Sequence, residues 1–305
     1  MDDLIFEPQA KLLWHGDKVK KWLETGRINP ILVEIAPTGY CNASCPWCFF
    51  KEKQDKERIS TPVLLRAIDD LVKLGIKAIN WSGGGEPTLH PDFERFLFHA
   101  ARQGVKQGLF TNGYNTIPAQ ELFAWIRISL TDKGFARIKK PHVPFGICVN
   151  HVESYSNDDL LGFCLEAHNF GARYFQIRPA LVGSYDKQPI LKAPTFLQRC
   201  AGHNFDVYVT DYKYKEAIKP KDYSECYGYH FCPSIDWNGK LSVCLYLTLN
   251  PEYILGDLNK ESLLDIWHAI EKSAVVTEKC QNCCKNHEIN KLLYKTKNIH
   301  LEDFL

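Results

Sequence analysis

The sequence lacks a charge excess, a long apolar run and a disulfide-dense composition, and each absence excludes a class of protein. Its 37 Lys and Arg balance 36 Asp and Glu, a difference of +1, which disfavours a surface built for nucleic acid or anionic membranes. No apolar run approaches the ~20 residues that span a bilayer. The 12 cysteines among 305 residues, about 4%, fall below the ~8–10% of disulfide scaffolds. An ordinary folded domain is therefore expected.

The start of the chain also lacks the basic and apolar segments of a secretion signal, since its first residues are acidic. We therefore expect a cytoplasmic protein whose thiols stay reduced and free to bind metal. The cysteines are unevenly placed, with three between Cys41 and Cys48 and seven between Cys200 and Cys284. Thiols clustered in this way indicate metal ligands before they indicate disulfides.

Strand-like and helix-like segments alternate through the first half of the chain. Runs of β-branched and aromatic residues predict strands, and apolar residues at helical spacing predict helices between them. The expected strands are 31–35, 77–81, 108–111, 125–130, 145–149 and 173–178. The expected helices are 60–74, 91–103, 118–123 and 158–169. This alternation predicts an α/β fold, a partial (β/α)6 barrel with a small C-terminal cysteine-rich α+β extension.

Three parts of the chain are distinguished by this pattern. Residues 1–29 form an N-terminal extension, in which Trp14 and Trp22 are expected to anchor onto the body of the protein. Residues 30–182 form the barrel core. Residues 183–305 form a linker and the cysteine-rich extension, where cysteine is dense and helical periodicity is weaker.

Three thiols with the spacing C-x3-C-x2-C directly follow the first expected strand, namely Cys41, Cys45 and Cys48. Zinc sites usually take four ligands from paired C-x2–4-C units. Three thiolates without a nearby fourth suggest a cubane iron–sulfur cluster with one open iron, where a substrate or cofactor can bind. A loop after a strand lies at the C-terminal edge of a parallel sheet, the edge at which such folds carry their chemistry.

With Trp47 before its last cysteine, this motif resembles the signature of the radical S-adenosylmethionine (SAM) superfamily. The resemblance implies a [4Fe–4S] cluster held by Cys41, Cys45 and Cys48, whose fourth iron chelates the amino and carboxylate groups of SAM. It also implies reductive cleavage of SAM to a 5′-deoxyadenosyl radical, which abstracts a substrate hydrogen. Flavodoxin or ferredoxin is the electron donor that this chemistry implies. A chance match or a zinc site is the alternative, and the further motifs disfavour it.

Further motifs of the superfamily follow in its usual order. A Gly-Gly-Glu-Pro element after the second expected strand resembles the one that meets the SAM amino group, and a Thr-Asn-Gly ends the third strand. Glycine allows close backbone approach, and a carboxylate suits an ammonium partner. Asn150 and Arg178 are contacts to the SAM ribose or carboxylate, or are structural. The expected cofactor-binding residues are Trp47, Gly84, Gly85, Glu86, Pro87, Asn112, Ser129, Asn150 and Arg178.

A second cysteine cluster surrounds Asn238 and Gly239, a pair that predicts a β-hairpin. The segment resembles the Twitch domain, a shortened SPASM domain with the pattern C-x(9–15)-G-x4-C followed by C-x2-C. Cys226 fits the first interval with twelve residues, whereas Cys232 leaves only six. The resemblance implies one auxiliary [4Fe–4S] cluster, and a structural zinc site with the same thiols is the alternative. The implied ligands are Cys226, Cys244, Cys280 and Cys283.

Five cysteines remain outside the two predicted clusters. Cys148 and Cys164 lie in an expected strand and helix and are predicted to be core residues. Cys200 is a surplus thiol. Cys232 and Cys284 are surplus as well, and they are the candidate hydrogen-atom donors if the reaction is an epimerisation.

The leading hypothesis is a radical SAM oxidoreductase that acts on a small polar metabolite such as a sugar, cyclitol or nucleoside. A substrate radical is a strong reductant, and a nearby auxiliary cluster can accept its electron. About 30 residues precede the first strand, too few for a leader-peptide recognition domain, which disfavours but does not exclude a ribosomal peptide maturase or epimerase. Dehydration and decarboxylation are further possibilities within the superfamily. A zinc-binding interaction protein is the alternative from another class.

Overall fold

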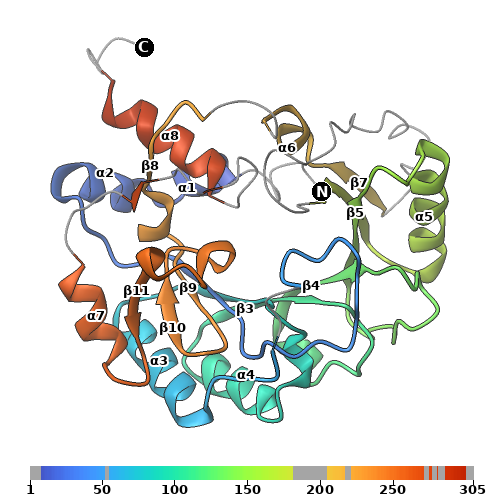
Figure 1. Ribbon diagram of the computed structural model, residues 1–305, viewed down its shortest axis with the longest axis horizontal. Helices are drawn as coiled ribbons and strands as arrows, with labels where there is room; N and C mark the ends of the chain where they lie inside the picture. Colours follow the sequence, from blue (N-terminus) through green and yellow to red (C-terminus); the bar gives the residue numbers. More distant parts are fainter. Residues whose placement is uncertain are drawn as a thin grey trace.

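Ten strands of the computed structural model form one sheet, in the order β11-β10-β9-β1-β2-β3-β4-β5-β6-β7 (Figure 1). The structure describes residues 8–51, 55–180, 205–216, 221–270, 275–276, 280 and 286–299. Each neighbouring pair from β1 to β7 is parallel. The predicted α/β fold, a partial barrel with a C-terminal extension, is confirmed.

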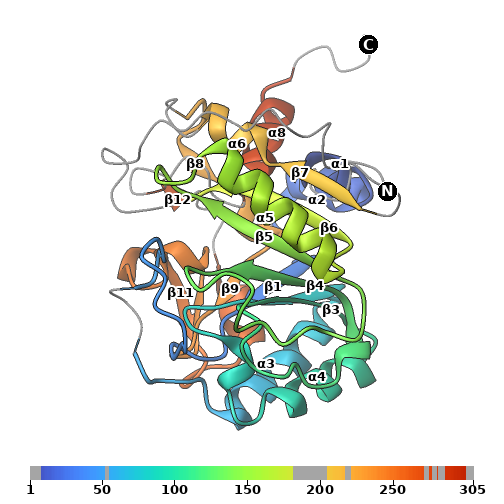
Figure 2. The same cartoon turned by 90° about the vertical axis from the view of Figure 1, so that its right-hand side faces the viewer.

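The parallel strands are β1 (Leu32–Ile35), β2 (Ala78–Trp81), β3 (Lys106–Thr111), β4 (Phe123–Leu130), β5 (Phe145–His151), β6 (Tyr174–Pro179) and β7 (Asp206–Val209). The helices that connect them are α3 (Thr61–Lys73), α4 (Phe93–Arg102) and α5 (Asn157–Phe170). Figures 1 and 2 show α3 and α4 beneath the curved sheet and α5 beside β5 and β6. All six predicted strands and three of the four predicted helices are confirmed.

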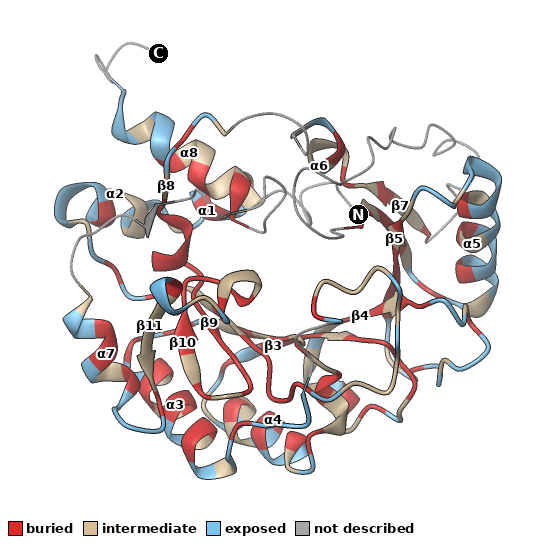
Figure 3. Cartoon of the chain, viewed as in Figure 1, coloured by how far each residue is buried: buried red, intermediate tan, exposed pale blue. Residues whose placement is uncertain are grey.

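The main core lies between the outer face of the sheet and these helices. Phe145, Ile147 and Val149 of β5 belong to one cluster with Leu160 and Cys164 of α5. Because strand side chains alternate between faces, the intervening positions of β5 face the concave side of the sheet. Figure 3 shows the strands as largely buried, whereas the helices alternate between buried and exposed sides. The concave face is therefore available for polar, functional side chains.

Two features of the parallel region differ from the sequence prediction. The helix expected at 118–123 is a single 3-10 turn (Gln120–Leu122), because Ala119 adopts a left-handed backbone with φ of 45° and the chain passes directly into β4. A seventh strand, β7, lies beyond the predicted barrel core and extends the sheet parallel to β6. The boundary at residue 182 lies outside the described residues.

The C-terminal part joins the same sheet through its hairpin. Strand β9 (Ser234–Ile235) pairs in parallel with β1, and β10 (Lys240–Ser242) pairs antiparallel with β9. Strand β11 (Ile254–Asp257) completes this edge. The hairpin predicted at Asn238 and Gly239 is confirmed, and its pairing places it directly beside the strand that precedes the first cysteine cluster. The remaining elements are α6 (Asp211–Glu216), β8 (Glu225–Cys226), α7 (Leu263–Ala269), β12 (Val275–Val276) and α8 (His287–Lys297).

The N-terminal helices α1 (Pro8–Leu13) and α2 (Gly16–Thr25) pack against the C-terminal part. Trp22 is buried, with its ring centroid 4.8 Å from that of Tyr227, so its predicted anchoring role is confirmed. Trp14 is 88% exposed, and the same prediction was wrong for it because it lies in the turn between the two helices. None of the described helices has the length and apolar composition needed to cross a membrane.

Candidate active site

A cavity of about 240 Å³ opens at the C-terminal ends of the parallel strands. Its walls come from the strand ends, from the loop that carries the first cysteine cluster, and from Leu245 and Tyr246 of the C-terminal part. Its polar and charged lining includes Glu34, Glu86, Ser129, Asn150, Arg178 and Lys213. The site thus has the location expected for a parallel α/β enzyme.

Cys41, Cys45 and Cys48 all line this cavity. The backbone N–H of Cys48 donates to the carbonyl of Cys45 at 3.1 Å, which closes the loop into a turn. Burial raises the pKa of Cys41 and Cys48, and it raises the pKa of Cys45 to about 11. Three thiols on one loop that face one cavity fit a [4Fe–4S] cluster with one open iron.

Glu86 is a buried carboxylate on the loop after β2, and it also lines the cavity. Its Oε1 accepts hydrogen bonds from the Thr88 and Thr111 hydroxyls, each at 2.7 Å, and its Oε2 accepts from the Asn112 N–H at 2.7 Å. Burial raises the pKa of Glu86, and these hydrogen bonds oppose the rise. The carboxylate therefore stands fixed between the ends of β2 and β3, with Oε2 able to accept from an ammonium group.

Asn112 connects the end of β3 to the cysteine loop. Its Oδ1 accepts from the Tyr114 N–H at 2.9 Å, which fixes the orientation of the amide. Its Nδ2 then donates to Asn42 Oδ1 at 2.8 Å and lies 3.8 Å from Cys41 Sγ. Hydrogen bonds to cluster thiolates orient them and tune the cluster. Asn112 thus fits a role beside the first cluster ligand as well as at the SAM site.

Most of the other predicted cofactor contacts line the same cavity. Ser129, Asn150 and Arg178 line the cavity from β4, β5 and β6, and Arg178 Nε donates to Asn150 Oδ1 at 2.9 Å. Trp47 lines it as well, with its ring edge-on to Tyr155 at 5.8 Å between centroids.

Of the Gly-Gly-Glu-Pro element, Gly84 and Gly85 line the cavity. Pro87 is buried at the start of a 3-10 turn capped by Glu86 and is not among the lining residues. Sequence reasoning missed Phe110 and Thr131, which also line the cavity from the ends of neighbouring strands. Each lies two residues from a predicted contact, Phe110 from Asn112 and Thr131 from Ser129, which was the available signal.

Three of the four predicted auxiliary ligands lie within the described residues, namely Cys226, Cys244 and Cys280. Cys226 is buried on β8 in an apolar cluster with Val243, the neighbour of Cys244. Burial raises the pKa of Cys226, Asn290 lowers it through a hydrogen bond from Nδ2 to Sγ at 3.4 Å, and the nearby Cys280 thiol raises it. The Cys280 thiol thus lies near that of Cys226, and Cys244 follows a residue of the cluster that contains Cys226.

The surplus cysteines have other environments. Cys148 and Cys164 are fully buried, as predicted for core residues. Cys232 is buried and is not among the residues that line the cavity. Cys200, Cys283 and Cys284 lie outside the described residues.

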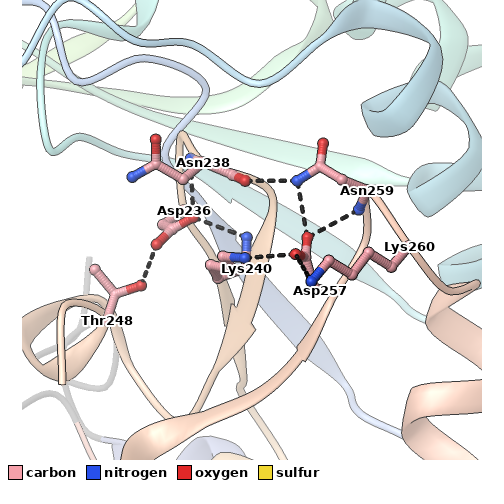
Figure 4. Close-up of polar contacts among 7 residues, drawn as sticks. All are labelled: Asp236, Asn238, Lys240, Thr248, Asp257, Asn259 and Lys260. Atoms are coloured by element: carbon pink, nitrogen blue, oxygen red, sulfur yellow. Dashed lines mark hydrogen bonds and ion pairs between the residues drawn. The ribbon is translucent and has the colours of Figure 1, made fainter. Parts of the chain in front are cut away.

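The hairpin that carries Cys244 is held by a buried polar network (Figure 4). Asp236 is fully buried and accepts from the Asn238 and Lys240 N–H groups and from the Thr248 hydroxyl, at 2.9, 2.8 and 2.5 Å. Lys240 Nζ donates to Asp257 Oδ2 at 2.5 Å. Burial alone would raise the pKa of Asp257, but the hydrogen bonds from Lys240 and Asn259 lower it to about 2. The network fixes the turn between β9 and β10 and ties it to β11.

Two family profiles match the chain. The one described as the radical SAM superfamily covers residues 35–129, from the end of β1 through the cysteine loop to Ser129. The chain belongs to the radical SAM superfamily. The second, described as an iron–sulfur cluster-binding domain and named SPASM, covers residues 226–285 and begins at Cys226. The chain thus combines the family that holds a [4Fe–4S] cluster with SAM and a family of auxiliary iron–sulfur cluster-binding domains.

Relatives of this radical SAM protein act on different kinds of molecule. The mycofactocin maturase MftC of Mycobacterium tuberculosis is 33% identical over 96 residues, 31% of this chain and 24% of the relative. An S-adenosylmethionine-dependent nucleotide dehydratase of Selenomonas ruminantium is 33% identical over 138 residues, 42% of this chain and 47% of the relative. Each match thus covers less than half of the relative's own length. The Streptococcus suis SuiB structure bound to S-adenosylmethionine shares the fold, with TM-score 0.59 and 18% identity over 85% of this chain and 71% of SuiB.

Proposed function

We propose that this radical SAM enzyme oxidises a small polar metabolite, such as a sugar, cyclitol or nucleoside, with an auxiliary [4Fe–4S] cluster as electron acceptor. The observation that carries the proposal is the composition of the cavity wall. Cys41, Cys45 and Cys48 line one part of it, and Leu245 and Tyr246, which directly follow the predicted auxiliary ligand Cys244, line another. A substrate in this cavity would lie next to both iron–sulfur segments.

The lining of the cavity supports a polar substrate. Glu34, Arg178 and Lys213 bring charged groups to it from three different elements, and Asn150 holds the Arg178 guanidinium through Nε. Groups of this kind recognise hydroxyls, amines and anionic substituents. The nucleotide dehydratase among the relatives is consistent with a small substrate bearing such groups.

Oxidation is favoured over epimerisation by the placement of the thiols. When bound, SAM and the clusters supply the 5′-deoxyadenosyl radical and take up the electron that the substrate radical releases with loss of a proton. An epimerase instead needs a group that returns a hydrogen atom to the substrate radical. Among the described residues, the thiols that line the cavity are Cys41, Cys45 and Cys48, all assigned to the cluster. Cys232, the candidate donor that the structure describes, is buried elsewhere.

Anaerobic incubation with SAM, a flavodoxin or ferredoxin donor system and a panel of polar metabolites tests this proposal. We expect one substrate class to increase 5′-deoxyadenosine formation and to yield a product that has lost two hydrogens. A product of unchanged mass that carries one solvent deuterium would contradict oxidation and establish epimerisation. The Cys45→Ala variant is the matched control, because it removes a predicted cluster ligand and should form no 5′-deoxyadenosine.

Maturation of a ribosomal peptide is the second candidate. It is favoured by the 33% identity with a mycofactocin maturase over 96 residues. A peptide substrate predicts that a precursor peptide encoded beside this gene, and none of the small metabolites, stimulates 5′-deoxyadenosine formation. The same assay therefore separates the two substrate classes.

A further inference from the structure

Trp237 lies in the turn between β9 and β10 and is fully buried, although turns of this kind are usually exposed. Its indole Nε1 donates to Asp55 Oδ2 at 3.0 Å. Asp55 belongs to the segment that follows the cysteine loop, and its Oδ1 accepts from the Glu57 N–H at 2.9 Å. The indole thus extends from the C-terminal hairpin into the SAM-binding half of the protein, the half that carries the cysteine loop and the Gly-Gly-Glu-Pro element.

Two glycines of the SAM-binding half make room for this indole. A Cβ atom at Gly84 would stand 2.0 Å from Cζ3 of Trp237, and one at Gly39 would stand 2.7 Å from its Nε1. Real Cβ atoms essentially never approach other atoms within 3.0 Å. Neither glycine has a positive φ, so backbone conformation does not explain them. The close approach of Trp237 explains Gly84, and Trp237 together with its partner Asp55 explains Gly39, where Asp55 Oδ1 would stand 2.4 Å from the added Cβ atom.

The loops that bear these two glycines are the ones that must be aligned for SAM to bind. Gly39 precedes the first cluster cysteine by two residues, and Gly84 precedes Glu86 by two. The loops are joined by the Gly85 N–H, which donates to the Thr38 carbonyl at 2.9 Å, and by the Glu86 N–H, which donates to the Tyr40 carbonyl at 2.8 Å. Trp237 packs across this junction from the side of the hairpin.

Aromatic contacts extend the same packing to the third cysteine. The Phe50 ring stands edge-on to Trp237, with centroids 5.9 Å apart, and stacks on Tyr246 at 6.2 Å. Cys48 and Phe49 border the same apolar cluster. The hairpin therefore contacts the cysteine loop at both of its ends.

We propose that Trp237 is a positioning residue for SAM, which holds the Glu86 loop in register with the cysteine loop, so that the C-terminal hairpin sets the affinity for SAM. The inference depends on the family's use of SAM and not on which substrate is oxidised. If Trp237 served only as a core residue, its replacement would lower the stability of the protein and leave the affinity for SAM unchanged.

The test compares Trp237→Phe with Trp267→Phe in the cluster-loaded, full-length protein. Trp267 is a matched control, since it is also buried in the C-terminal part and its indole donates to the Ile28 carbonyl at 3.1 Å. We expect Trp237→Phe to weaken SAM binding by about 2-fold to 10-fold, the range for loss of one hydrogen bond. Calorimetry with SAM measures this, and the iron content should be unchanged in both variants.

Two further readouts keep the proposal testable if Trp237→Phe folds poorly. Asp55 is exposed, so Asp55→Ala removes the acceptor of the Trp237 indole, and that of the Glu57 N–H, without opening a cavity in the core. We expect a loss of SAM affinity in the same direction, with Asp55→Asn close to wild type. The change that SAM induces in the electron paramagnetic resonance spectrum of the reduced cluster should require more SAM in Trp237→Phe and Asp55→Ala. Equal SAM affinity in Trp237→Phe and Trp267→Phe, or wild-type affinity in Asp55→Ala, would overturn the proposal.

Discussion

At the scale of single residues, the chemistry of the site is set by what burial does to a few ionisable groups. Cys41, Cys45 and Cys48 are predicted by spacing alone, but only the structure shows that burial raises the pKa of each, to about 11 for Cys45. At neutral pH these thiols are therefore protonated before iron binds. Because iron binds the thiolate, cluster assembly must release protons.

This proton release predicts a pH dependence. A thiol with a raised pKa binds metal more weakly at low pH, so the yield of cluster reconstitution at limiting iron should rise between about pH 7 and pH 9. A Cys226→Ala variant isolates the cysteine loop from the auxiliary site. Visible absorbance and bound iron measure the yield under anaerobic conditions. A yield that is constant or falls over this range would contradict protonated ligand thiols.

At Gly84 the sequence alone accounts for only one of two reasons for a glycine. The sequence explains Gly84 by close approach of the backbone to SAM. The structure adds a second reason, since Trp237 occupies the volume of its missing side chain. No local pattern could reveal this contact, because the two residues are far apart in the sequence and meet only when the hairpin pairs with β1.

At the scale of elements, the hairpin β9–β10 is the part that joins the two halves of the site. The Asn238 and Gly239 pair predicted its turn, and Gly239 adopts the expected positive φ of 74°. Its partner strand was not predictable, because the parallel pairing of Glu34 with Ser234 is a long-range contact. Strand β7 was missed because four residues with mixed polarity carry little periodic signal.

The buried network of Figure 4 makes the hairpin's stability testable. Asp236→Ala removes the acceptor of the buried Thr248 hydroxyl and of two partly buried N–H groups, those of Asn238 and Lys240. We expect a loss of about 2–4 kcal/mol in the free energy of unfolding, because unsatisfied buried donors are costly.

The matched control for the hairpin is Asn259→Ala on the exposed rim of the same network, where Asn259 donates to the Asn238 carbonyl at 2.8 Å. There we expect less than about 1 kcal/mol, since water can replace the lost hydrogen bond. Chemical denaturation of both variants, followed by tryptophan fluorescence, measures the difference. Equal losses in the two variants would show that Asp236 does not organise the hairpin.

At the scale of the whole molecule, the sequence predicted the order of the motifs. The fold explains how motifs that lie far apart in the chain form one site. Parallel strands bring the ends of β2 to β6 to one edge, so Glu86, Asn112, Ser129, Asn150 and Arg178 meet although they are spread along the chain. The predicted cluster ligand Cys45 meets them there. The sequence could not show that the C-terminal extension continues the same sheet and closes the cavity with Leu245 and Tyr246.

If one chain holds two iron–sulfur clusters beside one cavity, its metal content must show both. The anaerobically reconstituted protein should contain about eight irons and no zinc, the content of two cubanes. Cys45→Ala and Cys226→Ala should each retain about four irons, whereas Cys232→Ala should retain about eight. About four irons with one bound zinc in the wild type would contradict a second iron–sulfur cluster. Loss of four irons in Cys232→Ala but not in Cys226→Ala would contradict Cys226 as an auxiliary ligand.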